Sequence, residues 1–250
     1  MKYAYDISII VPAHNEEKYV RRCIESIRQA DACFKGTTEI IVVCNRCTDR
    51  TREIALECGA KTVINEDRCI ALVRNAGIKE SGGEIIVTID CDNRMTPGTL
   101  AEIYAKIKSG KYIGGGAPIR FERESFPLML NDYMCRAGFK ATGIYAGIIW
   151  AERETFDAVG GFVDKRSMED IATAKAIKDY GKKQGKKFGV LGYNALINST
   201  RKYDDAGDDW LYFKLAFKNA VPMIKSALGK PEEYDALIDE MFYDYNDNHG

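Results

Sequence analysis

The amino-acid sequence predicts an α/β fold with a mostly parallel sheet flanked by helices. Over the first hundred residues, short runs rich in β-branched residues alternate with stretches whose apolar residues recur at helical spacing. These runs are mostly apolar, which is typical of parallel strands that helices cover on both faces. In such sheets, ligands bind beyond the carboxyl ends of the strands.

The first half of the chain carries the regular part of this pattern. We expect strands over residues 7–11, 39–43, 61–64 and 84–89, and helices over residues 16–28, 48–58, 70–79 and 99–108. In the first of these helices, Val20, Ile24 and Ile27 share one face. Gly59 is placed to end the second helix.

The second half is less regular. We expect strands over residues 117–121, 144–150 and 188–193, and helices over residues 125–140, 152–159 and 169–180. Three consecutive glycines at residues 114–116 lack the spacing of a phosphate-binding loop, and we interpret them as a turn. The chain after Asp208 is dense in apolar residues and predicts a helical C-terminal segment.

The composition bounds the class of protein. The chain has 250 residues, of which 46% are hydrophobic and 29% charged, and its net charge is -1. These values suit one soluble domain with a small appendage and give no reason to expect nucleic acid as a partner. We identify no secretory signal and no bilayer-spanning run, so we expect a cytoplasmic protein, with peripheral contact at the inner face of the membrane left open.

Eight cysteines raise the question of redox or metal chemistry. Cys44 and Cys47 have CxxC spacing after a predicted strand, which is compatible with a redox or zinc site. The chain offers no second CxxC pair, and its only histidines are His14 and His249. We therefore expect reduced thiols.

Asp90 and Asp92 are the most informative residues, because they follow the apolar strand over residues 84–89. Two acids at the exit of a buried strand are costly unless positive charge meets them. Mg²⁺ and Mn²⁺ bind one or two carboxylates and leave sites for phosphate oxygens. The alternative is two solvated acids that begin a loop. Polar clusters at residues 12–16 and 44–46 follow two other strands, so we expect all three clusters at one edge of the sheet.

Five segments in chain order resemble the family 2 glycosyltransferases, which have the GT-A fold and are mostly inverting. They are residues 7–17, 42–51, 74–77, 90–92, and 159–162 followed by 168–170. The resemblance implies a GT-A domain over residues 1–205, with a nucleotide-sugar-binding half (1–110) and an acceptor-binding half (111–205). Residues 206–250 would form a helical C-terminal extension.

The resemblance also implies roles for the residues at matching positions. The residues expected to contact the nucleotide-sugar donor are Pro12, Ala13, Glu16, Asn45, Arg74, Asp90 and Arg201. Asp90 would contact the sugar or ribose, and Arg201 would contact the phosphates. Lys202 is a further candidate for phosphate contact. Residues 44–46 replace the acidic pair that is common in the family, so the identity of the nucleobase stays open.

Metal binding and catalysis fall on four acids. By resemblance, Asp92 holds Mn²⁺ or Mg²⁺ with Asp90, and Asp170 is the general base, with Glu169 as second choice. Many GT-A enzymes add a histidine to the metal, but this part of the chain has none. Water and phosphate, or another group such as Asn198, would complete the shell.

The chemistry of sugar transfer requires these residue types independently of the resemblance. A leaving diphosphate gains negative charge, which a divalent metal stabilises as a Lewis acid. The transition state resembles an oxocarbenium ion, and the acceptor hydroxyl must lose a proton. A carboxylate base contributes about a hundred- to ten-thousand-fold to such a step. Asp170 at the start of a helix is equally typical of a capping residue, and one aspartate could do both.

Two further side chains have an ordinary interpretation beside a functional one. His14 could contact substrate or be a polar loop residue. Trp150 could stack on an acceptor sugar or lie in the core.

The function expected is therefore metal-dependent, inverting transfer of a sugar from a nucleotide sugar to the hydroxyl of a glycan, a lipid-linked or a small-molecule acceptor. Three alternatives are a nucleotide-sugar-binding protein without turnover, a nucleotidyltransferase and a glycosidase. A nucleotidyltransferase normally has a glycine-rich loop after the first strand, and residues 12–17 contain no glycine. A homodimer and membrane contact through the C-terminal segment remain open.

Overall fold

The computed structural model of the chain describes residues 2–126, 128–129, 132–133, 136, 142–145, 147–164, 169–192, 195–201 and 204. The expected C-terminal extension over residues 206–250 and much of the expected helix over residues 125–140 lie outside these ranges, as does Lys202. The predicted division at residue 205 and the two halves of the domain therefore stay predictions.

Within the described residues the main sheet has seven strands. In their order across the sheet they are β3 (Lys61–Asn65), β2 (Thr38–Asn45), β1 (Tyr5–Ala13), β4 (Gly83–Thr88), β8 (Ile149–Glu152), β6 (Tyr112–Gly116) and β9 (Lys187–Val190). Strand β8 is antiparallel to both of its neighbours, and all other pairs are parallel. The predicted α/β fold with a mostly parallel sheet is confirmed.

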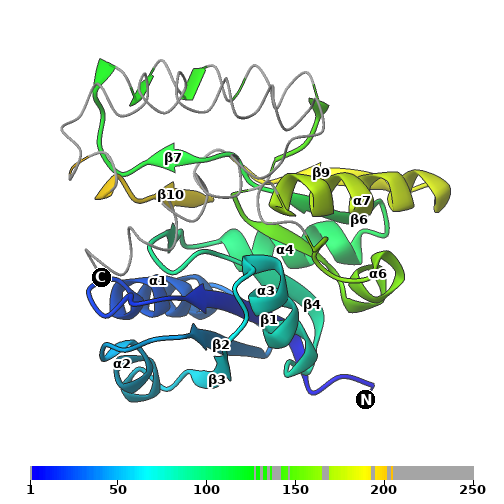
Figure 1. Cartoon of the computed structure of the whole chain (residues 1–250). Coiled ribbons are helices and arrows are strands. Elements are labelled where there is room, and N and C mark those ends of the chain that lie inside the picture. Colours follow the sequence, from blue (N-terminus) through cyan, green and yellow to red (C-terminus); the bar gives the residue numbers. More distant parts are fainter. Residues whose placement is uncertain are drawn as a thin grey trace, which may run out of the picture.

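A second, smaller sheet lies beside the main one (Figure 1). It consists of β5 (Arg94–Met95), β10 (Leu196–Asn198) and β7 (Arg120–Phe121), in that order. Strand β5 directly follows the acids after β4, and β10 leads to Arg201. The small sheet therefore brings the segment around residue 200 to the acids at residues 90–92.

Helices cover both faces of the main sheet. The described helices are α1 (Val20–Ala32), α2 (Thr51–Glu57), α3 (Ile70–Lys79), α4 (Thr99–Lys108), α6 (Arg153–Val159) and α7 (Glu169–Lys183). Ile9 of β1 packs with α1, α2 and α4 in one apolar cluster. Its neighbour Ile10 packs with α3, α6 and α7 in a second cluster. Because neighbouring strand residues point to opposite faces, both must be apolar, which explains the unbroken apolar runs.

The main differences from the sequence prediction concern boundaries and the three glycines. Helix α1 begins four residues later than expected, because residues 14–19 form the loop after β1. Of the expected strand over residues 117–121, only Arg120–Phe121 is a strand, and it belongs to the small sheet.

Gly114, Gly115 and Gly116 are not a turn but the buried end of strand β6. A Cβ atom on Gly115 would lie 2.3 Å from Cζ2 of Trp150 and 2.2 Å from the carbonyl oxygen of Gly189. The glycines are therefore required by close packing within the sheet, which is a known use of glycine inside strands.

Among the described helices, none combines the length and the hydropathy that crossing a membrane would require.

Candidate active site

The loops after β1 and β2 are fastened to each other at the carboxyl edge of the sheet. Ala13 and Cys44 are register partners at the ends of the two strands. The carboxylate of Asp49 accepts hydrogen bonds from the backbone amides of Glu17, at 2.9 Å, and Thr51, at 3.0 Å. Thr51 in turn accepts the backbone amide of Glu16 at 2.7 Å. These hydrogen bonds hold the backbone of Glu16 at the carboxyl edge of the sheet.

Of the residues predicted to line the nucleotide pocket, Pro12, Ala13 and Asn45 are buried at the ends of β1 and β2. The amide nitrogen of Asn45 donates to the carbonyl oxygens of Asn65 and Asp67, at 3.1 and 2.8 Å. Asn45 therefore shapes the chain after β3, and its contact with a nucleobase stays a prediction.

Asp90 and Asp92 follow β4 and differ in exposure. The side chain of Asp90 is 46% exposed, whereas that of Asp92 is 19% exposed. Each carboxylate pairs with a buried arginine, Asp90 with Arg74 and Asp92 with Arg201. The acids after the buried strand were expected to need compensating positive charge, and the two arginine side chains supply it, one for each acid.

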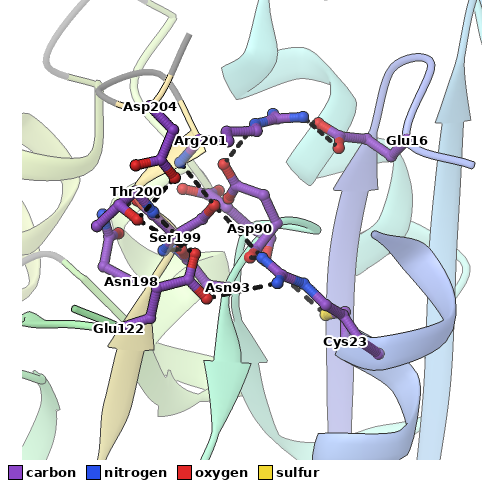
Figure 2. Close-up of polar contacts among 12 residues, drawn as sticks. Glu16, Cys23, Asp90, Asn93, Glu122, Asn198, Ser199, Thr200, Arg201 and Asp204 are labelled. Atoms are coloured by element: carbon purple, nitrogen blue, oxygen red, sulfur yellow. Dashed lines mark hydrogen bonds and ion pairs between the residues drawn. The ribbon is translucent and has the colours of Figure 1, made fainter. Parts of the chain in front are cut away.

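Arg201 is the partner of Asp92. Its Nε lies 3.1 Å from Oδ2 of Asp92, and its two terminal nitrogens donate to the carboxylate of Glu16 at 2.7 and 2.6 Å. Figure 2 shows this side chain extending from the segment after β10 toward Glu16 at the end of β1. Burial acts to lower the pKa of Arg201, but Asp92 and Glu16 outweigh it, so this pKa is raised and the group stays charged.

Arg74 of α3 is the partner of Asp90. Its Nη2 donates to Oδ1 of Asp90 at 2.6 Å, and its Nη1 donates to Oε1 of Glu169, the first residue of α7. Arg74 and Glu169 are both buried. Arg74 therefore joins Asp90, after β4, to Glu169, at the start of α7, a proximity that the sequence alone does not give.

Asp170 lies inside the first turn of α7 rather than at the capping position before it, because the helix begins at Glu169. The interpretation of Asp170 as a helix cap is therefore wrong in position, although an acid in the first turn still interacts favourably with the helix dipole. Burial and the neighbouring charge of Glu169 raise the pKa of Asp170 to about 6, while Arg74 acts in the opposite direction. A carboxylate of this pKa can accept a proton near neutral pH.

A group of residues that the sequence analysis missed supports Asp92. Arg22 of α1 donates to the carbonyl oxygen of Asp92 at 3.1 Å and to Oγ of Ser199 at 3.3 Å, and it forms an ion pair with Glu122 at 3.4 Å. Glu122 also accepts the backbone amide of Thr200 at 3.0 Å (Figure 2). The sequence signal for Arg22 was weak, because a single arginine on a helix does not reveal partners that are distant in sequence.

Trp150 is a core residue, and His14 contacts the end of β2. Trp150 is fully buried in β8 and packs against the glycines of β6 and β9, so its interpretation as a core residue is confirmed. Nδ1 of His14 lies 2.7 Å from the carbonyl oxygen of Asn45. The seven cysteines within the described residues are free thiols.

The donor set fits a hard divalent cation completed by substrate. The described residues contain no cluster of three or more His, Cys, Asp or Glu side chains that could hold a metal by themselves. Two carboxylates one residue apart at a strand exit suit Mg²⁺ or Mn²⁺, which keep positions for phosphate oxygens and water. The amide nitrogen of Asn198, the suggested further ligand, donates to the carbonyl oxygen of Ser199 at 3.1 Å.

Comparison with known proteins defines the class to which this fold and site belong. The model of the glycosyl transferase family 2 matches residues 8–146, more than half of the chain. The chain therefore belongs to glycosyltransferase family 2, as its sequence motifs predicted.

Among curated proteins, the chain is similar to the probable glycosyltransferase YdaM of Bacillus subtilis (strain 168). The two are 28% identical over 207 residues, which cover 72% of this chain and 48% of YdaM. The chain thus spans about half the length of that relative.

Many solved structures share the fold, and two of them illustrate it. The mannosyltransferase PcManGT from Pyrobaculum calidifontis, in complex with GDP-Man and Mn²⁺, has a TM-score of 0.62 at 22% identity, covering 78% of this chain and 57% of that one. S. aureus TarS (residues 1–349), in complex with UDP-GlcNAc, has a TM-score of 0.59 at 18% identity, covering 78% of this chain and 58% of that one. At these identities the likeness is one of fold, and the fold is that of the GT-A glycosyltransferases.

Proposed function

We propose that the chain is a metal-dependent, inverting glycosyltransferase that moves a sugar from a nucleoside-diphosphate sugar to an acceptor hydroxyl. One observation carries this proposal. Arg74 donates hydrogen bonds to both Asp90 and Glu169, so one guanidinium group joins an acid suited to a metal to the first turn of α7, where the candidate base Asp170 lies. The relatives support it, since the structures named above contain GDP-Man with Mn²⁺ or UDP-GlcNAc.

On the donor side, Asp92 and Asp90 would hold Mn²⁺ or Mg²⁺, and Pro12, Ala13 and Asn45 would line the nucleotide pocket. The ion, when bound, would supply positive charge beside the leaving diphosphate. It would also replace Arg201 as the counter-charge of Asp92. Arg201 could then turn to a phosphate oxygen, because a guanidinium binds phosphate and carboxylate with the same geometry.

On the acceptor side, Asp170 would take the proton from the attacking hydroxyl. Its raised pKa matches this task, because the base must be ionised before the reaction and basic enough to accept a proton. Glu169, whose carboxylate is bound to Arg74, is the weaker candidate for the base. Arg74 would offset part of the charge of Asp90 and Glu169, and it acts to lower the pKa of Asp170 against the effect of Glu169.

The test is a thermal-shift screen of UDP-, GDP- and CDP-sugars with and without Mn²⁺, followed by measurement of nucleoside diphosphate release with candidate acceptors. We expect one nucleotide class to raise the melting temperature only when metal is present, since a bound donor stabilises the folded state by mass action. Absence of any metal-dependent shift would contradict the proposal. Binding without transfer to any acceptor would favour a nucleotide-sugar-binding protein. The acceptor class and contact with a membrane stay predictions.

A further inference from the structure

Asn75 of α3, next to Arg74, contacts the turn after α6. Its side-chain oxygen accepts the backbone amide of Phe162 at 2.7 Å, and its side-chain nitrogen donates to the carbonyl oxygen of Phe162 at 3.0 Å. A single side chain thus satisfies both backbone groups of one loop residue, as a neighbouring strand would. Two such bonds fix the position and the orientation of the peptide together.

The turn is built to approach Asn75 closely. Gly160 and Gly161 have φ values of 83° and 80°, a conformation that favours glycine. A Cβ atom on Gly161 would lie only 2.5 Å from Oδ1 of Asn75. The two glycines therefore let the backbone reverse direction directly against the amide.

The turn is connected in the same way to the start of α7. The backbone amide of Val163 donates to Oγ1 of Thr173 at 3.0 Å, and this hydroxyl donates to the carbonyl oxygen of Glu169 at 2.6 Å. The buried ring of Phe162 stacks on Phe156 at 5.7 Å. A continuous set of contacts thus leads from Asn75 to the turn of α7 that contains Asp170.

We propose that Asn75 is a positioning residue for sugar transfer, acting through Phe162 and Thr173 on the place of Asp170. The inference rests on the proposed function, because its catalytic consequence requires Asp170 to be the base. Arg74 holds the first turn of α7 by charge, and Asn75 holds Phe162, in the turn after α6, by hydrogen bonds. Since a base must stand within hydrogen-bond reach of the hydroxyl, small displacements of α7 reduce turnover steeply.

The test compares Asn75→Ala with Asn75→Asp and with Ile78→Ala, which weakens packing at the far end of the same helix. For Asn75→Ala we expect kcat to fall about tenfold or more while the donor KM changes less than about twofold. Asn75→Asp keeps the acceptor of the Phe162 amide but sets a second carboxylate oxygen against the Phe162 carbonyl oxygen, so it should not restore kcat. Ile78→Ala should lower the melting temperature without this loss of kcat.

The positioning role is contradicted if Ile78→Ala loses as much kcat as Asn75→Ala, or if the donor KM of Asn75→Ala rises as much as its kcat falls. Hydrogen exchange gives a second readout that needs no activity. In Asn75→Ala, the Phe162 amide and the first turn of α7 should exchange faster than in the wild type, with β1 and β4 unchanged. Unchanged exchange at Phe162 would overturn the inference. Failure of the wild type to transfer any sugar would overturn the proposed function and the catalytic part of the inference, while the exchange measurement would still decide whether Asn75 positions the start of α7.

Discussion

The guanidinium group of Arg201 forms two hydrogen bonds with the carboxylate of Glu16, at 2.7 and 2.6 Å, across 185 positions of sequence. The side chains are only 8% and 6% exposed. The same guanidinium faces Asp92 at 3.1 Å. Arg201 therefore joins three segments of the candidate site: the loop after β1, the acids after β4 and the segment after β10.

Replacing Glu16 should destabilise the protein through the charge that it leaves behind. In Glu16→Gln, buried Arg201 loses its two-point partner and keeps only Asp92, so we expect a loss of about 3 kcal/mol in the free energy of unfolding. Urea denaturation measures this loss. The matched control is Glu57→Gln, which removes the exposed partner of Arg21 and should cost no more than about 1 kcal/mol. Equal losses in the two variants would mean that the buried ion pair contributes no more to the free energy of unfolding than the exposed one.

Replacing Asp170 should separate binding from chemistry. Asp170→Asn should bind the nucleotide sugar as the wild type does, while its transfer rate falls about a hundred- to ten-thousand-fold, the range for loss of a general base. Calorimetry and diphosphate release measure the two quantities. Asp179→Asn, at an exposed position of the same helix, should leave both unchanged. Turnover of Asp170→Asn at the wild-type rate would show that the base is another group.

The acid limb of the pH profile should report Asp170. A base must be deprotonated, and burial with the charge of Glu169 raises the pKa of Asp170 to about 6. In the free enzyme, kcat/KM should therefore rise with pH through about 6. Glu169→Gln removes a negative charge that favours protonation of Asp170, so the limb should move to lower pH. A limb that stays in place, or moves to higher pH, would contradict the assignment.

Replacing Gly115 should disturb the core around Trp150. In Gly115→Ala the new Cβ would meet Gly189 at 2.2 Å and Trp150 at 2.3 Å, and overpacking of this kind costs about 1–3 kcal/mol. Urea denaturation and the emission of Trp150 should both change. Gly192→Ala, whose Cβ would meet its nearest neighbour at an ordinary 3.6 Å, should behave as the wild type. An unchanged stability of Gly115→Ala would mean that β6 does not need its glycines.

The fold was largely predictable from local pattern. The unbroken apolar runs in β1, β2 and β4 are a direct consequence of two covered faces, and both features are visible in one sequence. The glycines of β6 were misassigned because the need for them comes from Trp150 and Gly189, which lie far away in sequence. Spacing along the chain carries no information on such tertiary packing.

The candidate site was predictable only where its residues follow strands. Asp90 and Asp92 stand out because acids after a buried strand require compensation. The compensating groups did not stand out, since Arg74 and Arg201 reach their partners only through the fold. Arg22 and Asn75 were missed for the same reason: each is an ordinary polar residue on a helix until its partner is placed.

The central claim is that Asp90 and Asp92 hold a divalent cation for the diphosphate of the donor. The most direct measurement is calorimetric titration of wild type and Asp92→Asn with UDP, GDP and CDP, with and without Mn²⁺. The account predicts that Mn²⁺ strengthens binding of one nucleotide to the wild type by at least about tenfold, or 1.4 kcal/mol, and that Asp92→Asn loses this gain. An Asp92→Asn variant that keeps the full Mn²⁺-dependent gain would contradict it.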